Sequence, residues 1–394
     1  MIDLNDSDTE RLLRTTAREV LVGWVERDSS DVPSAADLWQ EIISLGWAGL
    51  AVPGACGSGG SLLELGILLE ELGRAATPTP LFQAAAVGSL VAREGLTDEG
   101  KELLRSVATG GTTVALIASN EATANLTEVD GSSGRKLIGG PYLVEWASEA
   151  DRLVVPYRVD SGIGLASFAP RVEGVSVERV DAIDDEPVGR VVLLRVPLAA
   201  GVPLTNSPLS SRDWLEARAR IALLRAAEMV GGASRVLELT VEHVAKRWQF
   251  GRPLGSFQAV QHMCADMAIK LDGARFAVYE GLWLAETRRT CRAAAAVAAY
   301  FAGETYEYVT RTAAQLHGGM GYTTEYPLQR YFRHAKAQRL RQGAVRTQLM
   351  AIADLLPYTT ERPVPSHGSR SLVTGANEIA DNALNESVRG TALS

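Results

Sequence analysis

QLHGGMGYTTEYP, at residues 315–327, is the stretch that does most to decide the fold of this chain. It places three glycines within four positions, and glycine lets a backbone approach a ligand closely because it has no side chain. Such loops are common, so the loop alone predicts little. Its context adds weight, because a helical pattern precedes it and Arg333 follows the final proline by six residues. We therefore expect a ligand-contacting loop between two helices.

A second stretch, KRWQFGRPLGSFQAVQH at residues 246–262, lies more than fifty residues upstream of the first. Arg247 offers a planar fork of donors that suits phosphate. Gly251 and Pro253 predict a turn directly after it. Taken alone, these residues also fit the basic end of a helix followed by an ordinary loop.

The rest of the sequence falls into three blocks. Apolar residues recur at three- and four-residue spacings before residue 110 and again over 214–356, which predicts amphipathic helices. Short β-type runs, separated by Gly, Asp and Ser, fill the block between them. We predict an α+β fold with an N-terminal helical domain (1–110), a small antiparallel middle β-domain (111–205), a C-terminal four-helix bundle (206–357) and a flexible tail (358–394). In detail, helices are expected over 10–27, 35–45, 62–72, 83–93 and in four long segments after 214, and strands over 114–118, 152–157, 163–168 and 191–196.

Both stretches, together with the order of the blocks, resemble the acyl-CoA dehydrogenase family over nearly the whole chain except the tail. Residues 38–53 add a weaker match to the N-terminal part of that family. The resemblance implies the family's fold and FAD as the cofactor. It also implies an acyl thioester substrate, carried by CoA or by a carrier protein, and an assembly of at least two subunits.

The resemblance divides the cofactor-binding residues into two sets. In the first set, Arg247 meets the pyrophosphate and Phe250 packs on the cofactor of a neighbouring subunit. Gln315, Gly318 and Gly319 reach the adenosine diphosphate part of the same neighbour's cofactor. We call these five residues the outward set.

The second set would hold the flavin ring of the chain itself, and it matches the family poorly. The family holds the flavin ring with two segments of its middle domain. Ser119 and Asn120 are the only match to the first segment. Trp146 is a poor match to the second, and it fits a flavin-stacking residue or a core tryptophan equally well. FAD is nevertheless the cofactor that the resemblance as a whole predicts.

The catalytic glutamate of the family is absent. It commonly lies 27 residues after the loop glutamine, and counting from Gln315 reaches Gln342. A carboxamide cannot accept a proton at neutral pH as a carboxylate does. The alternative position, on the first helix of the bundle, is occupied by Ile221. Glu216 and Glu228 on that helix lie too far round it or along it to replace the base.

Several polar side chains remain near the expected site, among them Glu145 and three arginines, Arg220, Arg341 and Arg346. Arginines beside a lost base would favour an anionic ligand, or would stabilise an enolate without a general base. Arg341 and Arg346 also fit ordinary surface arginines on the last helix.

Composition excludes other classes of function. A formal charge of −8 and a pI near 5.4 argue against nucleic acid as a partner. The longest apolar run is too short to span a membrane, and the acidic N-terminus does not fit a secretory signal, so we expect a cytoplasmic protein. The three cysteines show no metal-ligand spacing, so no metal site is expected. They are Cys56, Cys264 and Cys291.

Three functions remain open. In the first, the chain is a divergent FAD-dependent oxidoreductase acting on an acyl thioester, with Gln342 at the position of the base. Alternatively, it is a non-catalytic companion subunit of a heteromeric acyl-CoA dehydrogenase, paired with a glutamate-bearing paralogue. A repurposed flavoenzyme, whose reaction needs no α-proton abstraction, is the third. The first and third are compatible with a homo-oligomer, whereas the second requires a hetero-oligomer.

Overall fold

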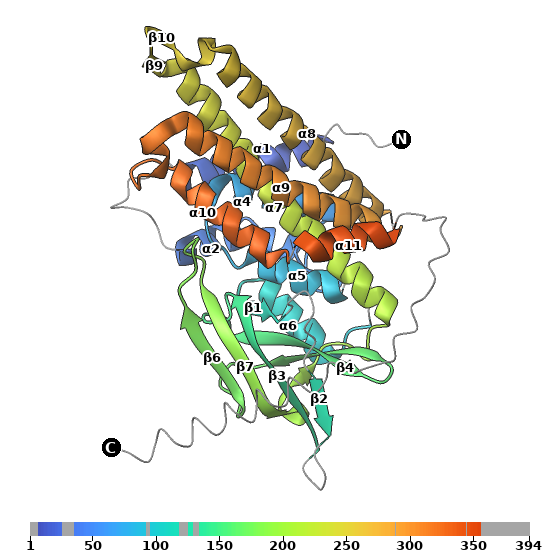
Figure 1. Cartoon of the computed structure of the whole chain (residues 1–394). Coiled ribbons are helices and arrows are strands. Elements are labelled where there is room, and N and C mark those ends of the chain that lie inside the picture. The colour runs from blue at the N-terminus through green and yellow to red at the C-terminus, as the bar shows by residue number, and fades with distance from the viewer. Residues whose placement is uncertain are drawn as a thin grey trace, which may run out of the picture. The chain divides into compact units, whose positions relative to one another are not determined.

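The computed structural model describes residues 7–25, 35–91, 95–117, 125–128, 134–287, 289–343 and 345–355. All of them belong to one compact unit, Met1–Leu355. Within it, helices come first, strands second and helices last, as predicted (Figure 1). The predicted tail lies outside the described residues, and the predicted boundaries between the domains stay predictions.

The N-terminal part consists of helices, four of which begin and end within about three residues of their predicted limits. The capping box that starts α4 shows why a helix begins there: Ser61 Oγ accepts from Glu64 N at 3.0 Å, and Glu64 Oε2 accepts from Ser61 N at 2.7 Å. The short α3 and the later α6 were not among the predicted segments. The helices are α1 (Asp8–Val25), α2 (Ala35–Ser44), α3 (Trp47–Leu50), α4 (Leu62–Ala75), α5 (Leu81–Val91) and α6 (Asp98–Ala108).

The strands form two four-stranded sheets, with the orders β1-β4-β5-β8 and β2-β3-β7-β6. All the pairings in them are antiparallel except that of β1 with β4, which is parallel and corrects the purely antiparallel prediction. The strands are β1 (Val114–Leu116), β2 (Asn125–Glu128), β3 (Arg135–Glu145), β4 (Arg152–Val159), β5 (Gly162–Phe168), β6 (Val175–Val180), β7 (Val188–Pro197) and β8 (Val202–Pro203).

The sequence prediction missed two of the longer strands. β3 contains Gly139, Gly140 and Pro141, where its register against β7 shifts, so no regular alternation is visible in the sequence. β6 pairs only with β7 at the edge of its sheet, and its three valines are only half-buried. β3 bears on the candidate site, because it ends at Glu145.

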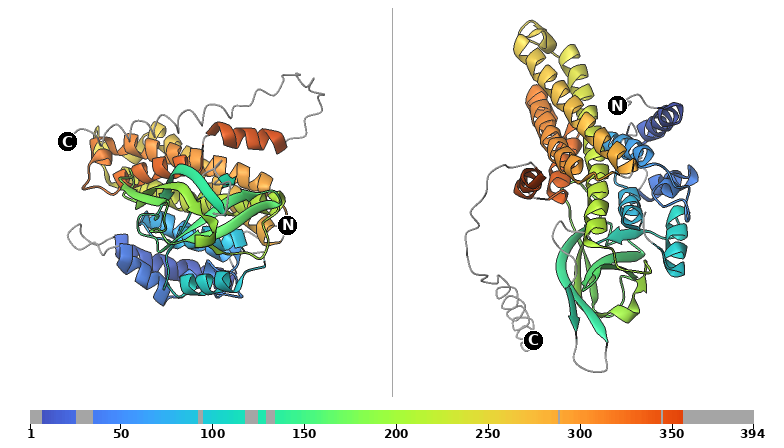
Figure 2. Two further views of the ribbon diagram at one scale, coloured as in Figure 1. Left: turned by 90° about the horizontal axis from the view of Figure 1, so that it is seen from below. Right: turned by 90° about the vertical axis from the view of Figure 1, so that its right-hand side faces the viewer.

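The C-terminal part is a bundle built on the long helix α7 (Ser211–Lys246), which packs against α4, α8 and α9. Four helices were predicted; the structure adds a fifth, α11, to them. The ends of α7 and α8 project beyond the other helices and are joined by a small β-hairpin (Figures 1 and 2). The elements are β9 (Trp248–Gln249), β10 (Arg252–Pro253), α8 (Gln258–Glu286), α9 (Arg292–His317), α10 (Leu328–Arg341) and α11 (Val345–Leu355).

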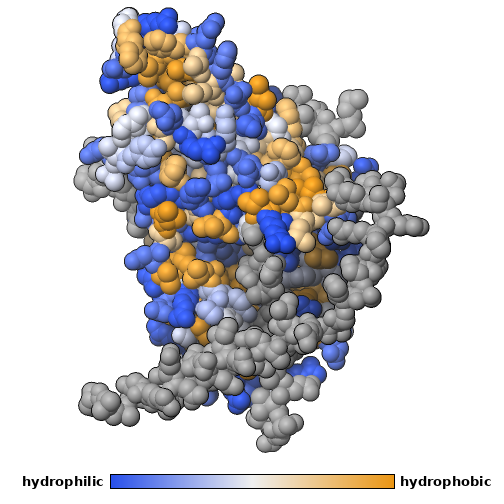
Figure 3. Space-filling model, viewed as in Figure 1, coloured by the Kyte–Doolittle hydropathy of each residue, from blue (hydrophilic) through white to orange (hydrophobic). Residues whose placement is uncertain are grey.

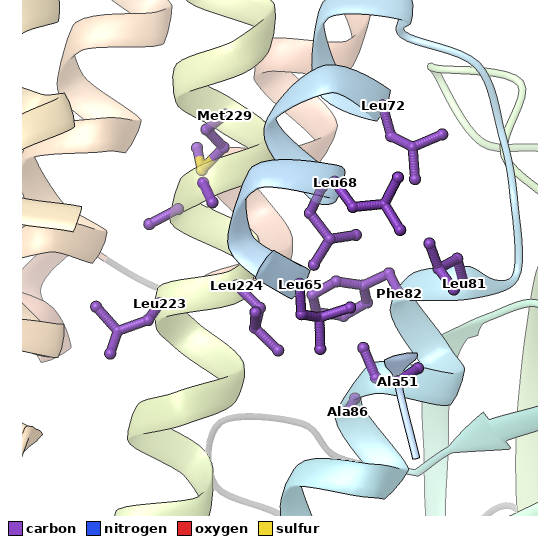
Figure 4. Packing of buried hydrophobic residues seen from close by; sticks show 14 of the residues in the cluster. Ala51, Leu65, Leu68, Leu72, Leu81, Phe82, Ala86, Leu223, Leu224 and Met229 are labelled. Atoms are coloured by element: carbon purple, nitrogen blue, oxygen red, sulfur yellow. The ribbon is translucent and has the colours of Figure 1, made fainter. Parts of the chain in front are cut away.

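One hydrophobic core joins the N-terminal helices to the bundle. Leu65 and Leu68 of α4, Phe82 of α5 and Leu224 of α7 pack together at its centre (Figure 4). The backbones of α4 and α7 are in direct contact, since a Cβ added at Gly73 would lie 1.9 Å from a carbonyl oxygen of α7. This close contact fixes the position of α7, and therefore of the side chains that it carries.

Candidate functional site

Arg247 and Phe250 lie at the projecting end of the bundle. Arg247 caps the C-terminus of α7, and the β9–β10 hairpin follows it at once. Phe250 is 87% exposed and has a φ of 54°, in a region that side chains rarely adopt. Trp248 beside it is 62% exposed, and Figure 3 shows hydrophobic surface at this end of the molecule. A cation and two aromatic rings are thus presented outward, with little of their surface used within this chain.

The glycine loop of the outward set lies at the end of α9. Gln315, Gly318 and Gly319 are all exposed. Gly318 has a φ of 63°, which favours glycine, and a Cβ at either glycine would meet no atom within 4 Å. The loop therefore offers open backbone to a molecule outside this chain.

A pair of stacked histidines connects this loop to the end of α7. His243 of α7 lies one turn before Arg247, and its ring stacks on His317 of α9 at 4.1 Å between centroids. His317 Nε2 is 3.1 Å from the hydroxyl of Tyr326. Burial, together with the nearby His317 and Arg247, lowers the pKa of His243 to about 4, and burial also lowers the pKa of His317. The structure thus brings the two halves of the outward set to one end of the bundle.

Gln342 lies at the C-terminus of α10, and its side chain points at α7. Its Nε2 donates to the carbonyl oxygen of Ala222 at 3.5 Å, next to Ile221. Gln342 and Ile221, the two positions at which the resemblance would place the family's base, therefore lie close together and neither is a carboxylate; that they are base positions stays a prediction. Gln342 Oε1 is buried and accepts no hydrogen bond from the part of the chain that the structure describes.

Arg341, the residue before Gln342, is held by two carboxylates. Its guanidinium makes a bidentate pair with Asp184, with Nη2 to Oδ1 at 2.9 Å, and its Nε lies 3.0 Å from Glu145 Oε1. Asp184 and Glu145 are each 8% exposed. Arg341 is therefore not the surface arginine that the sequence allowed, and it connects α10 to the end of β3.

Arg225 of α7 binds the same carboxylate from the other side. It forms an ion pair with Glu145 Oε2, and its Nη1 lies 3.0 Å from Glu228 Oε2. Its guanidinium also stacks on the ring of Phe82 at 3.4 Å from the centroid. Gln83 of α5 adds a hydrogen bond to Glu145 Oε2 at 3.0 Å. Glu145, Asp184, Arg225, Glu228 and Arg341 form what we call the Glu145 network.

Trp146, the next residue after Glu145, is buried at 6% exposure. Its ring nitrogen donates to Glu186. Burial, together with the charge of Glu145, raises the pKa of Glu186 well above its ordinary value. The cavity that remains between these side chains and Glu228 measures about 10 Å³, enough for roughly one water molecule.

The two predicted sets of FAD-binding residues differ in how well they fit the cofactor. The outward set is exposed and carries a cation, aromatic surface and open glycine backbone, which fit a phosphate-bearing aromatic molecule. The resemblance would place the ring of the chain's own cofactor beside Trp146. There, Glu145 and two arginines join β3 directly to α7 and α10, and the residues do not fit a flavin ring. Ser119 and Asn120 lie outside the described residues.

The three candidate arginines do not come together. Arg341 belongs to the Glu145 network, and Arg346 is exposed on α11. Arg220 is 7% exposed and lies about 200° round α7 from Ala222, so it faces away from Gln342 and lines a separate pocket.

Within the described ranges, no group of His, Cys, Asp and Glu is arranged to hold a metal ion. No helix among them is both long enough and apolar enough to cross a membrane.

Sequence reasoning placed Glu145 and Arg341 near the site but missed Asp184, Glu186 and Arg225. Asp184 and Arg341 are 157 residues apart, so no local pattern could pair them. The spacing of Arg225 and Glu228 predicts an ion pair on α7, yet it does not indicate that the pair is buried.

Comparisons with known proteins agree with this fold. The model of the acyl-CoA dehydrogenase N-terminal domain matches residues 7–111, and that of the C-terminal domain matches residues 216–356. The chain is 31% identical to acyl-CoA dehydrogenase IpdE2 of Mycolicibacterium smegmatis, covering 85% of this chain and 96% of that protein. It is 29% identical to acyl-CoA dehydrogenase FadE27 of Mycobacterium tuberculosis, covering 82% and 88%.

Solved structures of similar fold agree with these matches. A variant of the Tcur3481-Tcur3483 steroid ACAD superimposes with a TM-score of 0.77 at 29% identity, over 88% of this chain and 97% of that one. The ChsE4-ChsE5 complex of Mycobacterium tuberculosis gives 0.78 at 24% identity, over 91% and 100%. PigA with FAD and proline gives 0.78 at 21% identity, over 90% of this chain and 99% of that one.

The Glu145 network makes a testable contribution to stability. Replacing Arg225 by methionine leaves Glu145 and Glu228 buried with fewer cationic partners, and breaking a buried pair in this way costs about 3–5 kcal/mol. We expect Arg225→Met to lower the free energy of unfolding by that amount in urea denaturation. The matched control is Arg179→Met, whose ion pair with Glu149 is largely exposed, so the loss should stay within about 1 kcal/mol. Equal losses in the two variants would contradict the network's role.

Proposed function

Because the chain belongs to the acyl-CoA dehydrogenase family, we propose that it is the subunit without a catalytic base in a two-chain acyl-CoA dehydrogenase. In that assembly it completes the FAD site of a glutamate-bearing partner, and the partner carries out the oxidation of the acyl thioester. The observation that carries this proposal is the contrast between the two ends of the molecule. The outward set is exposed and complete, while the chain's own cleft is bridged by the Glu145 network.

FAD is the cofactor that the family and its solved neighbours support, PigA with FAD among them. When bound, it accepts the hydride that leaves the substrate. Arg247 would hold its pyrophosphate through a fork of charged donors. Phe250 would cover an aromatic face, and the backbone of Gly318 and Gly319 would let the loop approach closely.

A hetero-oligomer is favoured over a homo-oligomer by the missing base. A dimer of identical copies would pair each outward set with a cleft that holds Gln342 and the Glu145 network. A partner with a glutamate and an open cleft would use the outward set productively. Two of the similar structures bear the names of two chains, Tcur3481-Tcur3483 and ChsE4-ChsE5, and we extend that arrangement to this chain.

The alternative of a divergent oxidoreductase, acting alone on an acyl thioester, receives less support. Stabilising an enolate without a base requires a cation aimed at the substrate oxygen. Arg341 is instead paired with Asp184 and Glu145, and Arg225 is paired with Glu145 and Glu228. The same pairs count against a repurposed flavoenzyme that uses this cleft. A cytoplasmic location and the carrier of the thioester stay predictions.

The role of the outward set can be tested in a reconstituted assembly. Co-expressing the chain with a glutamate-bearing paralogue from the same genome should give an active, flavin-containing complex. Arg247→Met in this chain should weaken FAD binding by about 10- to 100-fold, because it removes charged hydrogen bonds worth about 1.5–3 kcal/mol. The readouts are the FAD dissociation constant and the dehydrogenase rate, with size-exclusion chromatography to show that the complex persists.

Lys246→Met is the matched control, because Lys246 is an exposed cation directly beside Arg247. It should leave FAD binding within about twofold. A paralogue that is fully active and flavin-loaded without this chain would contradict the proposal. So would an Arg247→Met complex with unchanged affinity for FAD.

A substitution at the base position separates the proposal from its alternative. Gln342→Glu restores a carboxylate, but the cleft stays bridged by Glu145, Arg225 and Arg341. We therefore expect the purified Gln342→Glu chain, assayed alone with FAD and a panel of acyl-CoA thioesters, to show no dehydrogenase activity. Measurable turnover would support the divergent oxidoreductase and would count against a companion subunit.

A further inference from the structure

The glycine loop of the outward set is closed at its base by one hydrogen bond. His317, the last residue of α9, and Tyr326 stand at the two ends of the loop, and His317 Nε2 lies 3.1 Å from the Tyr326 hydroxyl. Gly318 follows His317 directly, and its N–H donates to the carbonyl oxygen of Gln315. The loop also folds back on His317, since a Cβ added at Gly321 would lie 3.1 Å from His317 Cβ. The open glycine backbone is thus anchored to one buried side chain.

The partners of His317 decide which of its ring nitrogens carries the proton. Nδ1 lies 2.8 Å from the carbonyl oxygen of Ala313, which can only accept, so Nδ1 is the donor. In a neutral ring Nε2 then accepts, and the hydroxyl of Tyr326 donates to it. Burial lowers the pKa of His317, which favours the neutral ring, and raises the pKa of Tyr326, which keeps the proton on its hydroxyl. One tautomer therefore satisfies both partners.

The ring of His243 connects this anchored loop to α7. It lies nearly parallel to the ring of His317, with 4.1 Å between the centroids and 22° between the planes. Two charged rings at this distance would repel, whereas two neutral rings attract through dispersion. The lowered pKa values of both histidines therefore fit a stable stack.

Arg247 is fixed to the other side of the stack through its backbone. Its N–H donates to the carbonyl oxygen of His243 at 2.8 Å, and its own carbonyl oxygen accepts from Leu254 N at 2.8 Å. Arg247 is thus bonded to one ring-bearing residue of the stack, and the glycine loop follows the other. The two rings set the spacing between the cation and the open backbone.

We propose that His243 and His317 are positioning residues, which hold Arg247 and the glycine loop at the separation that a single FAD molecule requires. The inference rests on the FAD-completing role proposed above. Under that role, Arg247 meets the pyrophosphate and the loop meets the adenosine diphosphate part of one cofactor, so both contacts form on the same molecule. Two linked contacts add to each other only when their spacing matches the ligand. The histidines act through the residues that contact the cofactor.

The test is the affinity for FAD of the complex between this chain and a glutamate-bearing paralogue. His243→Leu removes the flat ring and should weaken FAD binding about tenfold, because the spacing is no longer held. His243→Phe is the matched variant: it keeps a flat ring that stacks, and it should bind FAD within about twofold of the wild type. A general loss of packing would weaken both variants alike. Unchanged affinity in His243→Leu, or equal losses in the two variants, would overturn the proposal.

A second variant keeps the test decisive if His243→Leu does not fold. Tyr326→Phe removes one hydroxyl group and retains both histidines. It should weaken FAD binding about threefold to tenfold, the range expected for one neutral hydrogen bond. Tyr300→Phe, the same change at a half-buried tyrosine near the other end of α9, is the control and should stay within about twofold. Equal affinities of Tyr326→Phe and Tyr300→Phe would count against the positioning role.

Arg247→Met, measured in the same complex, separates this proposal from the role on which it rests. If Arg247→Met leaves the affinity for FAD unchanged, the FAD-completing role itself is wrong. If Arg247→Met weakens FAD binding while His243→Leu and Tyr326→Phe do not, the FAD-completing role stands and the positioning role is overturned.

Discussion

A single buried carboxylate, Glu145, holds together the parts of this molecule that matter for its function. Taking a carboxylate out of water costs several kcal/mol unless charged partners and hydrogen bonds compensate. Here Arg225 and Arg341 supply the charge and Gln83 supplies a further hydrogen bond. Because these partners come from α7, α10 and α5, the end of β3 is tied to three helices at one point.

This constraint determines what the cleft beside Gln342 can do. The cavity beside Trp146, which Glu145, Arg225 and Glu228 also line, measures about 10 Å³. Trp146 donates to the adjacent Glu186, whose pKa burial raises well above its ordinary value. The carboxamide of Gln342, at the predicted base position, and the ion pairs of the Glu145 network are separate features that support the same proposal. A change at Gln342 alone would leave those ion pairs in place. At the projecting end of the bundle, by contrast, Arg247, Phe250 and the glycine loop are all exposed.

Much of the fold follows from the sequence, because long amphipathic helices leave a clear apolar period and glycine loops mark their ends. Strand β3 was missed, because Gly139, Gly140 and Pro141 interrupt its alternation. At the site, counting from Gln315 predicted a base position at Gln342, and the structure places that side chain against α7 beside Ile221, the other predicted base position. The Glu145 network could not be predicted, because its members are brought together only by the packing of β3 against α7 and α10.

The central claim is that this chain completes a cofactor site in a partner and holds no flavin ring in its own cleft. The most direct test is to purify the chain alone, incubate it with excess FAD, remove the free cofactor, and measure FAD per chain from the absorbance released on denaturation. The account predicts essentially no retained flavin and an unfolding temperature that added FAD does not change. Retention of stoichiometric FAD by the isolated chain, with a raised unfolding temperature, would contradict it.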